Sequence, residues 1–250
     1  MHIYRDLFQY AHIAYQRPTG NEPLFDGNIS FSAINIGLDY ALIVEFQERV
    51  IIAFRGTGTT SDGIKSVRTW LSDLDIYPLR GPTRLVRQGR DPHVVLVQAG
   101  ILKDGSWGRG TIHDGFYTTW RKFKRVMTSY LIKFKDKPLY ITGHSRGGAL
   151  AELCARHVAK NMGKSCILVE YGTPRVGTEE YANQFQTLHV TGASLVNGYD
   201  LVMTVPPKIL GFHRAINKTK MVQPFWHMFF HRVRDHFQEN YVEALKKYYP

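Results

Sequence analysis

Cysteine is scarce in this sequence, and long apolar runs are missing from it. Two cysteines, Cys154 and Cys166, occur in 250 residues. Two thiols cannot build a disulfide framework, nor can they supply the ligands of a cysteine-built zinc site. No apolar run approaches the roughly 18 residues that span a bilayer. The sequence therefore excludes a disulfide-rich scaffold and predicts no transmembrane segment.

The first residues, Met1 to Asp6, also lack the apolar core of a signal peptide. Together with the sparse cysteine, this absence slightly favours a cytoplasmic protein over a secreted one. A mature form released from a precursor would begin in the same way, so secretion stays open as the alternative.

Acidic residues are fewer than basic ones: 21 Asp and Glu stand against 32 Lys and Arg, a net charge of +11. Such an excess is compatible with nucleic-acid binding, with attraction to an anionic lipid surface or simply with solubility. Zinc-finger spacings, basic zippers, RNA-recognition signatures and phosphate-binding loops are all missing. The densest basic stretch, Arg121 to Lys137, also carries apolar residues every three or four positions, which indicates a helix with a solvated basic face. Nucleic-acid binding is therefore not expected.

Core material, in contrast, is plentiful, with 44% hydrophobic and 13% aromatic residues. Strand and helix patterns alternate along the chain. The predicted strands are 41–46, 50–54, 139–142, 167–171 and 193–196, and the predicted helices between and beside them are 116–134, 147–162 and 178–188. This alternation predicts an α/β fold with a mostly parallel central sheet and helices on both faces. No linker, internal repeat or change in composition divides the chain, so residues 1–250 are predicted to form one domain.

A candidate nucleophile stands where the strand 139–142 gives way to the next helix. The segment contains Gly143-x-Ser145-x-Gly147. A serine between a strand and a helix occupies a sharp, strained turn, and glycines two positions away on each side remove side chains that would collide. The helix that follows offers free N–H groups to negative charge. An inert serine in a glycine-rich turn is the alternative, but the apolar strand before it favours the nucleophile.

Several blocks of the chain, in the same order, resemble the class 3 (fungal-type) lipases of the α/β-hydrolase fold. The blocks are Ile51–Thr57, similar to the family's oxyanion loop; Thr69–Leu74, similar to its tryptophan segment beside the lid; His113–Phe116, which opens the helix before the serine; and Tyr171–Gly177, the turn after the next strand. The resemblance implies a serine-dependent hydrolase of lipid acyl esters, similar to a triacylglycerol lipase. Such an enzyme forms an acyl-enzyme and needs no metal or organic cofactor.

A reactive serine needs a base, and the base needs an acid to orient it. In α/β-hydrolases both follow the serine, the acid first and the histidine second. Asp200 follows the predicted strand 193–196, at the sheet edge where catalytic loops gather. The family's acid likewise precedes a short loop that ends in two prolines, as the loop after Asp200 does here with Pro206 and Pro207. An ordinary turn or capping aspartate is the alternative, but Asp200 is the predicted orienting acid.

Four histidines follow this acid, namely His213, His227, His231 and His236. The spacing from Asp235 to Gln238 predicts a capped helix start, with His236 at the junction and its ring reaching outward. Family members often place the base in a similar His-x-x-x-x-Tyr setting near the C-terminus. His236 is therefore the predicted base, and His231 stays open as the alternative.

Two backbone N–H groups are predicted to stabilise the oxyanion. One belongs to Arg146, directly after the serine. The other belongs to Thr57, at the end of the block that resembles the oxyanion loop, and its hydroxyl is a further donor. The family usually carries an aliphatic residue where Arg146 stands. The Arg146 side chain is expected either to favour an anionic or zwitterionic head group or to pair with a local acid.

The segments around the predicted site bear on the substrate. Residues 58–68 occupy the place of the family's lid but are mostly polar. Residues 221–230 form an apolar cluster. It is expected to line an acyl pocket or to touch lipid, and the alternative is that it belongs to the core. His227 and His231 lie four apart but lack the carboxylate of the zinc pattern, so no metal site is predicted.

Alternative functions stay open beside the lipase. They are a phospholipase A, a short-chain esterase and a non-catalytic lipid-surface binding protein. The intact set of serine, aspartate and histidine argues against the last of these. The net charge suggests peripheral contact with an anionic lipid surface.

Overall fold

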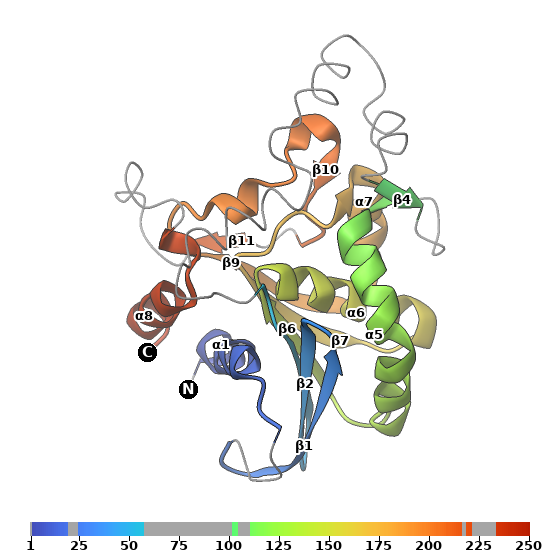
Figure 1. The fold of residues 1–250 in the computed structure, drawn as a ribbon, viewed down its shortest axis with the longest axis vertical. Helices are drawn as coiled ribbons and strands as arrows, with labels where there is room; N and C mark the ends of the chain where they lie inside the picture. The colour runs from blue at the N-terminus through green and yellow to red at the C-terminus, as the bar shows by residue number, and fades with distance from the viewer. Residues whose placement is uncertain (1, 20–24, 58–101, 105–110, 217–218, 222–233) are drawn as a thin grey trace.

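The computed structural model describes residues 2–19, 25–57, 102–104, 111–216, 219–221 and 234–250 (Figure 1). Several sequence features lie outside these residues: the lid-like segment 58–68, the tryptophan block 69–74, most of the region 78–109, and the apolar cluster after residue 221 with His227 and His231. What the sequence predicts for those segments stays a prediction.

A seven-stranded sheet forms the centre of the molecule, in the order β1-β2-β3-β6-β7-β9-β11. Its strands are β1 (Asn28–Ile36), β2 (Asp39–Phe46), β3 (Val50–Phe54), β6 (Leu139–His144), β7 (Cys166–Tyr171), β9 (Val190–Val196) and β11 (Thr219–Met221). The strands from β3 to β11 pair in parallel, whereas β1 and β2 are antiparallel at one edge. The mostly parallel sheet that the sequence predicts is confirmed.

Helices cover both faces of this sheet, as predicted (Figure 1). The helices α5 (Asp114–Lys133), α6 (Arg146–Met162) and α7 (Glu179–Gln186) pack on one face, and α1 (Ile3–Ile13) and α8 (Gln238–Tyr248) pack on the other. Side chains of a strand point alternately to its two faces. In β3, Ile52 therefore joins the core under α5 and α6, while its neighbours Ile51 and Ala53 join the core under α1 and α8. All three are apolar because each face is covered.

The basic helix α5 buries one face, as its periodicity predicts. Phe116, Trp120, Phe123, Met127 and Leu131 are fully buried. The basic side chains Arg121, Lys122, Arg125 and Lys133 are exposed on the other side of the helix. The dense positive charge of this stretch is thus an outer face of a core helix.

The edge strand β1 is a feature that the sequence patterns above do not predict. Four of its nine residues are Asn or Ser, which are depleted in strands, and most of its side chains are only partly buried. Continuous pairing with β2, from Ser30 opposite Glu45 to Ile36 opposite Asp39, holds it in the sheet. Its conformation thus comes from a neighbouring strand more than from local preference.

A second, small sheet and several short helices complete the described part of the chain. The sheet has the order β10-β8-β5-β4 and is antiparallel; its strands are β10 (Phe212–His213), β8 (Gly177–Thr178), β5 (Thr111–His113) and β4 (Leu102–Asp104). The short 3-10 helices are η1 (Ala14–Gln16), η2 (Leu201–Thr204), η3 (Lys208–Leu210) and η5 (Arg234–His236). Within the described ranges, no helix combines the length and the apolar character needed to cross a membrane.

Candidate active site

The candidate nucleophile Ser145 stands between β6 and α6 in a strained backbone conformation, with φ 60° and ψ −130°. A positive φ is costly for a residue with a side chain. The flanking glycines permit the close approach that this turn requires. A Cβ on Gly143 would lie 2.3 Å from the Gly147 carbonyl oxygen, and a Cβ on Gly147 would lie 2.2 Å from the Phe54 carbonyl oxygen. The strand, helix and turn that the pattern predicts are all present.

Three of the predicted site residues lie together as a hydrogen-bonded chain. His236 Nε2 is 2.8 Å from Ser145 Oγ, and His236 Nδ1 is 2.8 Å from Asp200 Oδ2. All three side chains are buried. The carboxylate is an acceptor only, so the ring donates from Nδ1 and leaves the Nε2 lone pair facing the serine hydroxyl. This arrangement can remove the proton from Ser145.

The segment that carries His236 differs from the expected one in two respects. No capping box is present, because the N-cap of α8 is Phe237 and has no side-chain cap bond. Asp235 instead accepts a hydrogen bond from the Tyr199 N–H at 2.9 Å, and its carbonyl accepts one from Asn197 Nδ2 at 3.0 Å. These bonds tie the histidine segment to the loop before Asp200. The His236 ring consequently points into the protein, where it is 3% exposed, and the prediction that it reaches outward is wrong.

Tyr241 contacts Asp200, the predicted orienting acid, on the other side from His236. Its hydroxyl donates to Asp200 Oδ2 at 2.8 Å and accepts from the Asn197 N–H at 3.1 Å. Burial raises the pKa of Tyr241 well above its ordinary value, and the Asp200 charge raises it further. The phenol therefore stays protonated and able to donate. Its place five residues after His236 was the available sequence signal, although helical periodicity marks it only as a core residue.

A second histidine lies against the ring of the candidate base. The His144 ring stacks on His236 with centroids 4.7 Å apart and an interplanar angle of 28°. Its Nδ1 is 2.8 Å from the hydroxyl of Tyr15, which follows α1. Burial lowers the pKa of His144 well below its ordinary value, and the neighbouring His236 lowers it further. His144 is thus a neutral ring beside the base, and no local sequence pattern links it to Tyr15.

The predicted oxyanion donors lie at the ends of β3 and β6. A Cβ on Gly56 would lie 2.6 Å from the His144 carbonyl oxygen, so the loop before Thr57 touches the backbone of the serine turn. Thr57 Oγ1 is buried and has no hydrogen-bond partner among the described residues. Arg146 is the first residue of α6, where N–H groups have no partner within the helix. The position of both residues is compatible with the oxyanion role, which stays a prediction.

The Arg146 side chain pairs with a local acid, the second of its two expected roles. Arg146 Nη1 forms an ion pair with Asp39, and Nη2 donates to Thr119 Oγ1 at 2.7 Å. The Asp39 side chain is 7% exposed and that of Arg146 is 21% exposed. The cation thus ties the start of α6 to β2 and α5.

Several other histidines and glutamates in the described part of the chain lie apart from Ser145, Asp200 and His236. His113 caps α5 by accepting from the Gly115 N–H at 3.2 Å, and His213 Nδ1 lies 3.1 Å from the Gly211 carbonyl oxygen. Glu152 and Glu170 are buried within the fold, and Glu179 is exposed in the first turn of α7. The hydrogen bonds that join Ser145, His236 and Asp200 involve none of these five residues.

A comparison with models of protein families assigns the chain to a family. Residues 51–210 match the model of the class 3 lipases. The chain belongs to the class 3 lipase family. The resemblance drawn from its sequence blocks is thereby confirmed.

Individual relatives share modest sequence identity with this class 3 lipase family member. A lipase of Rhizomucor miehei is 28% identical over 178 residues, which are 68% of this chain and 40% of that protein. A secreted mono- and diacylglycerol lipase of Malassezia restricta is 33% identical over 109 residues (40% and 34%), and a chloroplastic phospholipase A(1) of Arabidopsis thaliana is 27% identical over 183 residues (71% and 38%). The chain thus spans between about a third and two fifths of the length of these three relatives.

A solved structure supports the fold assignment independently. The triacylglyceride lipase of Rhizomucor miehei superposes with a TM-score of 0.65 at 21% identity, and the match covers 88% of this chain and 78% of that one. The predicted α/β-hydrolase fold is confirmed for this member of the class 3 lipase family.

Substitution of Gly172 in this class 3 lipase family member should lower activity by displacing the side chains of Asp200 and His236. Gly172 has φ 56°, and a Cβ there would lie 2.5 Å from Asp200 Oδ2 and 3.1 Å from His236 Nδ1. We expect Gly172→Ala to lower kcat for ester hydrolysis about 100-fold, because shifts of about 1 Å in a catalytic group have effects of this size. The measurement is steady-state kinetics together with the thermal unfolding midpoint.

Gly163 supplies the matched control for this substitution. It has a similar φ of 64°, but a Cβ there meets nothing within 4 Å. Gly163→Ala should have the same backbone cost of about 1–2 kcal/mol and leave kcat near the wild-type value. Equal losses of kcat in the two variants would contradict a direct effect on the triad.

The buried Glu170 should make stability depend on pH. Burial raises the pKa of Glu170 to about 7, although Arg214 and Ser194 lower it in part. Between its ordinary value of 4.5 and about 7, the folded carboxyl keeps a proton that the unfolded chain has lost. The free energy of unfolding therefore falls as pH rises through this window, by up to about 3 kcal/mol, and changes little above it for this group.

Glu170→Gln should remove this contribution, so that urea unfolding at pH 5 and pH 8 gives more similar free energies than in the wild type. The exposed Glu179→Gln is the control and should leave the difference unchanged. A Glu170→Gln protein with the full wild-type pH dependence would show that another group causes it.

Proposed function

We propose that this protein hydrolyses carboxylic esters of lipids with Ser145 as nucleophile, His236 as base and Asp200 as the acid that orients the base. The observation that supports this proposal is the pair of 2.8 Å contacts that join the three side chains. A serine made nucleophilic by an oriented histidine is suited to acyl transfer.

The chemistry proceeds in two halves. Ser145 Oγ attacks the ester carbonyl carbon while its proton passes to His236 Nε2, and Asp200 stabilises the imidazolium that forms. The N–H groups of Thr57 and Arg146 stabilise the oxyanion of the tetrahedral intermediate. The proton then passes to the leaving alkoxide, which gives the alcohol product and an acyl-enzyme. In the second half, water attacks the acyl-enzyme with His236 again acting as base, which releases the carboxylic acid product and restores Ser145.

Lipid acyl esters are the proposed substrates, because the relatives described above include a triacylglyceride lipase and a mono- and diacylglycerol lipase. A phospholipase A activity is the second candidate, and the plant relative named as a phospholipase A(1) favours it. The hydrogen-bonded triad favours catalysis over a lipid-binding role without turnover.

Peripheral contact with an anionic lipid surface is also part of the proposal. The net charge of +11 and the exposed basic face of α5 support it. One relative is named as secreted and another as chloroplastic, so the relatives do not support a cytoplasmic location over the others.

The experiment that tests the function is hydrolysis of an ester series of increasing acyl length, together with a triacylglycerol and a diacyl phospholipid. Hydrolysis of long-chain neutral esters is the expected result. Phospholipid turnover without triacylglycerol turnover would favour the second candidate, and no turnover of any ester would contradict the proposal.

A further inference from the structure

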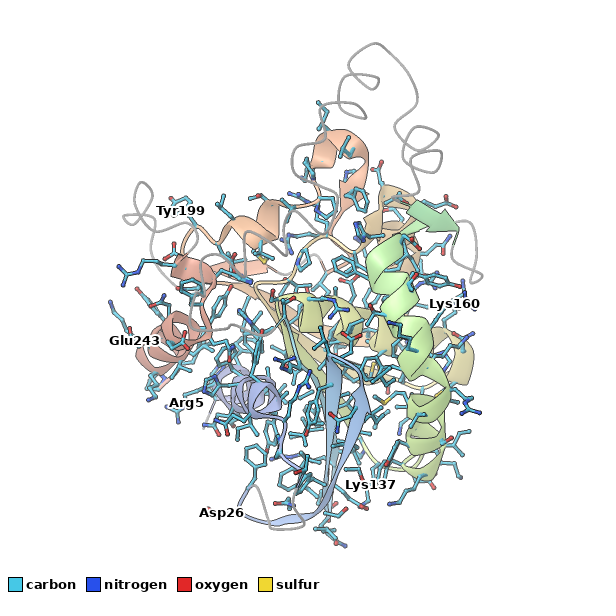
Figure 2. All side chains as sticks on the ribbon, in the orientation of Figure 1. Arg5, Asp26, Lys137, Lys160, Tyr199 and Glu243 are labelled. Carbon is cyan, nitrogen blue, oxygen red and sulfur yellow. The ribbon has the colours of Figure 1, made fainter. Side chains whose placement is uncertain are left out.

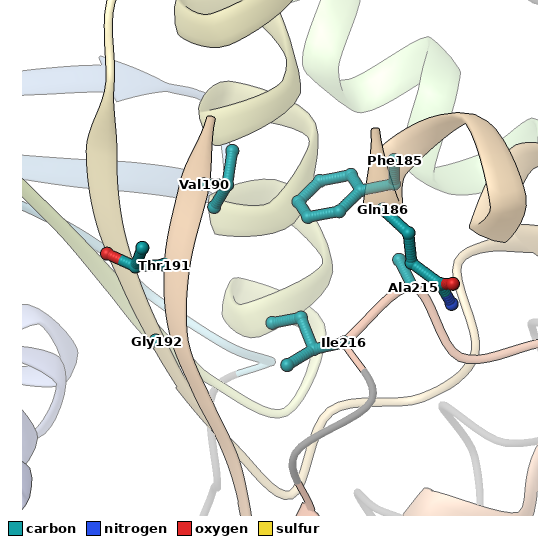
Figure 3. Close-up of a pocket in the computed structure, with 7 residues that line it drawn as sticks. All are labelled: Phe185, Gln186, Val190, Thr191, Gly192, Ala215 and Ile216. Carbon is teal, nitrogen blue, oxygen red and sulfur yellow. The ribbon is translucent and has the colours of Figure 1, made fainter. Parts of the chain in front are cut away.

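A groove of about 540 Å³ lies between α1 and α8, on the face of the sheet opposite α5 and α6. Residues of the two helices line it: Arg5, Phe8, Gln9, His12, Ile13, Val242, Leu245 and Lys246. Its volume is within the range of about 300–1,000 Å³ that is usual for small-molecule sites. A smaller cavity of about 230 Å³ beside β9 is lined without any charged side chain (Figure 3). Neither cavity is lined by Ser145, Asp200 or His236.

The groove is lined by both apolar and charged side chains, and its charged side chains, Arg5 and Lys246, are both positive. Ile13 and Val242 are half-buried and supply apolar surface that a ligand can reach, whereas Phe8 and Leu245, which also line the groove, are fully buried. Arg5, labelled on α1 in Figure 2, and the exposed Lys246 on α8 supply two cations. No acidic residue is among the eight that line the groove. An apolar slot with cations at its sides matches a single apolar chain that ends in an anion.

We propose that this groove binds the anion of a long-chain fatty acid, with the alkyl chain against Ile13 and Val242 and the carboxylate at Arg5 and Lys246. The volume and the lack of acidic lining carry the inference. The binding site stands independently of the catalytic proposal. That the ligand comes from the protein's own reaction rests on the proposed function, since hydrolysis of a lipid ester releases this anion.

The groove touches residues that contact the triad. The Phe8 ring stacks on Tyr241 with centroids 5.7 Å apart and meets the His144 ring edge-on at 6.1 Å. Tyr241 donates to Asp200, and His144 stacks on His236. In addition, His12 Nδ1 is 2.8 Å from Gln238 Oε1, two residues after the base. Two lining residues, Phe8 and His12, therefore contact the side chains packed around Asp200 and His236.

The test is isothermal titration of the full chain with sodium oleate below its micelle concentration, in a Ser145→Ala background. The groove variant adds Arg5→Glu and Lys246→Glu. The matched control adds Lys247→Glu and Arg121→Glu, which make the same change in net charge at exposed positions outside the groove. We expect the groove variant to bind oleate at least about tenfold more weakly and the control to differ less than about twofold.

Two further arms make the result specific. Oleyl alcohol, which lacks the charge, should bind both charge variants alike. Val242→Trp, which fills the slot, should weaken oleate and oleyl alcohol together, with thermal unfolding checking that the variant is folded. Equal weakening of oleate in the groove and control variants, or no oleate binding to the Ser145→Ala chain, would overturn the proposal. Because no turnover is measured, failure of the proposed function appears separately, in the ester assay.

Discussion

Ser145→Ala is expected to lower kcat/KM for ester hydrolysis by about 10⁴-fold or more. In the proposed mechanism this hydroxyl forms the acyl-enzyme, and neither His236 nor Asp200 is expected to take its place as a nucleophile. Removal of a triad member in serine hydrolases leaves activity that comes from the oxyanion donors and substrate binding alone. The measurement is kcat/KM on the ester that the wild type hydrolyses best.

Ser129 on α5 provides a control for this substitution, because it is exposed on the helix surface. Ser129→Ala should keep wild-type kinetics. Alanine at position 145 retains a side chain at φ 60°, so the strain of the turn stays and the unfolding midpoint should change little. Hydrolysis that survives Ser145→Ala within tenfold of the wild type would remove Ser145 as the nucleophile.

His236→Ala is the second large effect, again with an expected loss of about 10⁴-fold or more in kcat. His236 is the proposed base, and its Nε2 lies 2.8 Å from Ser145 Oγ. The neighbouring His144 is not expected to replace it, since its Nδ1 is engaged with the Tyr15 hydroxyl. KM should change little, because the ring takes part in proton transfer more than in substrate binding.

His231→Ala is the discriminating comparison, because His231 is the alternative base that the sequence leaves open. It should retain activity within about threefold of the wild type. An inactive His231→Ala protein beside an active His236→Ala protein would reverse the assignment. Loss in both would call for circular dichroism and unfolding of each before either is assigned.

Local patterns were sufficient for the parts of the site that local geometry builds. The Gly-x-Ser-x-Gly spacing predicts the turn at Ser145, because colliding side chains exclude most other residues there. The strand and helix on either side follow from short-range periodicity. Asp200 and His236 required the chain order of a fold family as well, since nothing in their own segments encodes a distance to Ser145.

Features that depend on distant segments escaped prediction. Tyr15 and His144 are 129 residues apart, and their contact follows from the packing of α1 on the sheet. Asp235 stands where a helix cap is expected, but its carboxylate accepts from the Tyr199 N–H and its carbonyl oxygen accepts from Asn197 Nδ2. Strand β1 has weak propensity and depends on β2. In each case a tertiary partner outweighs the local preference.

The separation of the catalytic groups along the chain has a consequence for the time at which activity begins. His236 follows Ser145 by 91 residues. At about 5–20 residues per second of synthesis, the serine turn is made roughly 5–18 s before the histidine. The nascent polypeptide thus carries the proposed nucleophile without the proposed base during elongation. Under the proposed mechanism, hydrolysis cannot begin until the later segment has been synthesised and His236 has reached Ser145 and Asp200.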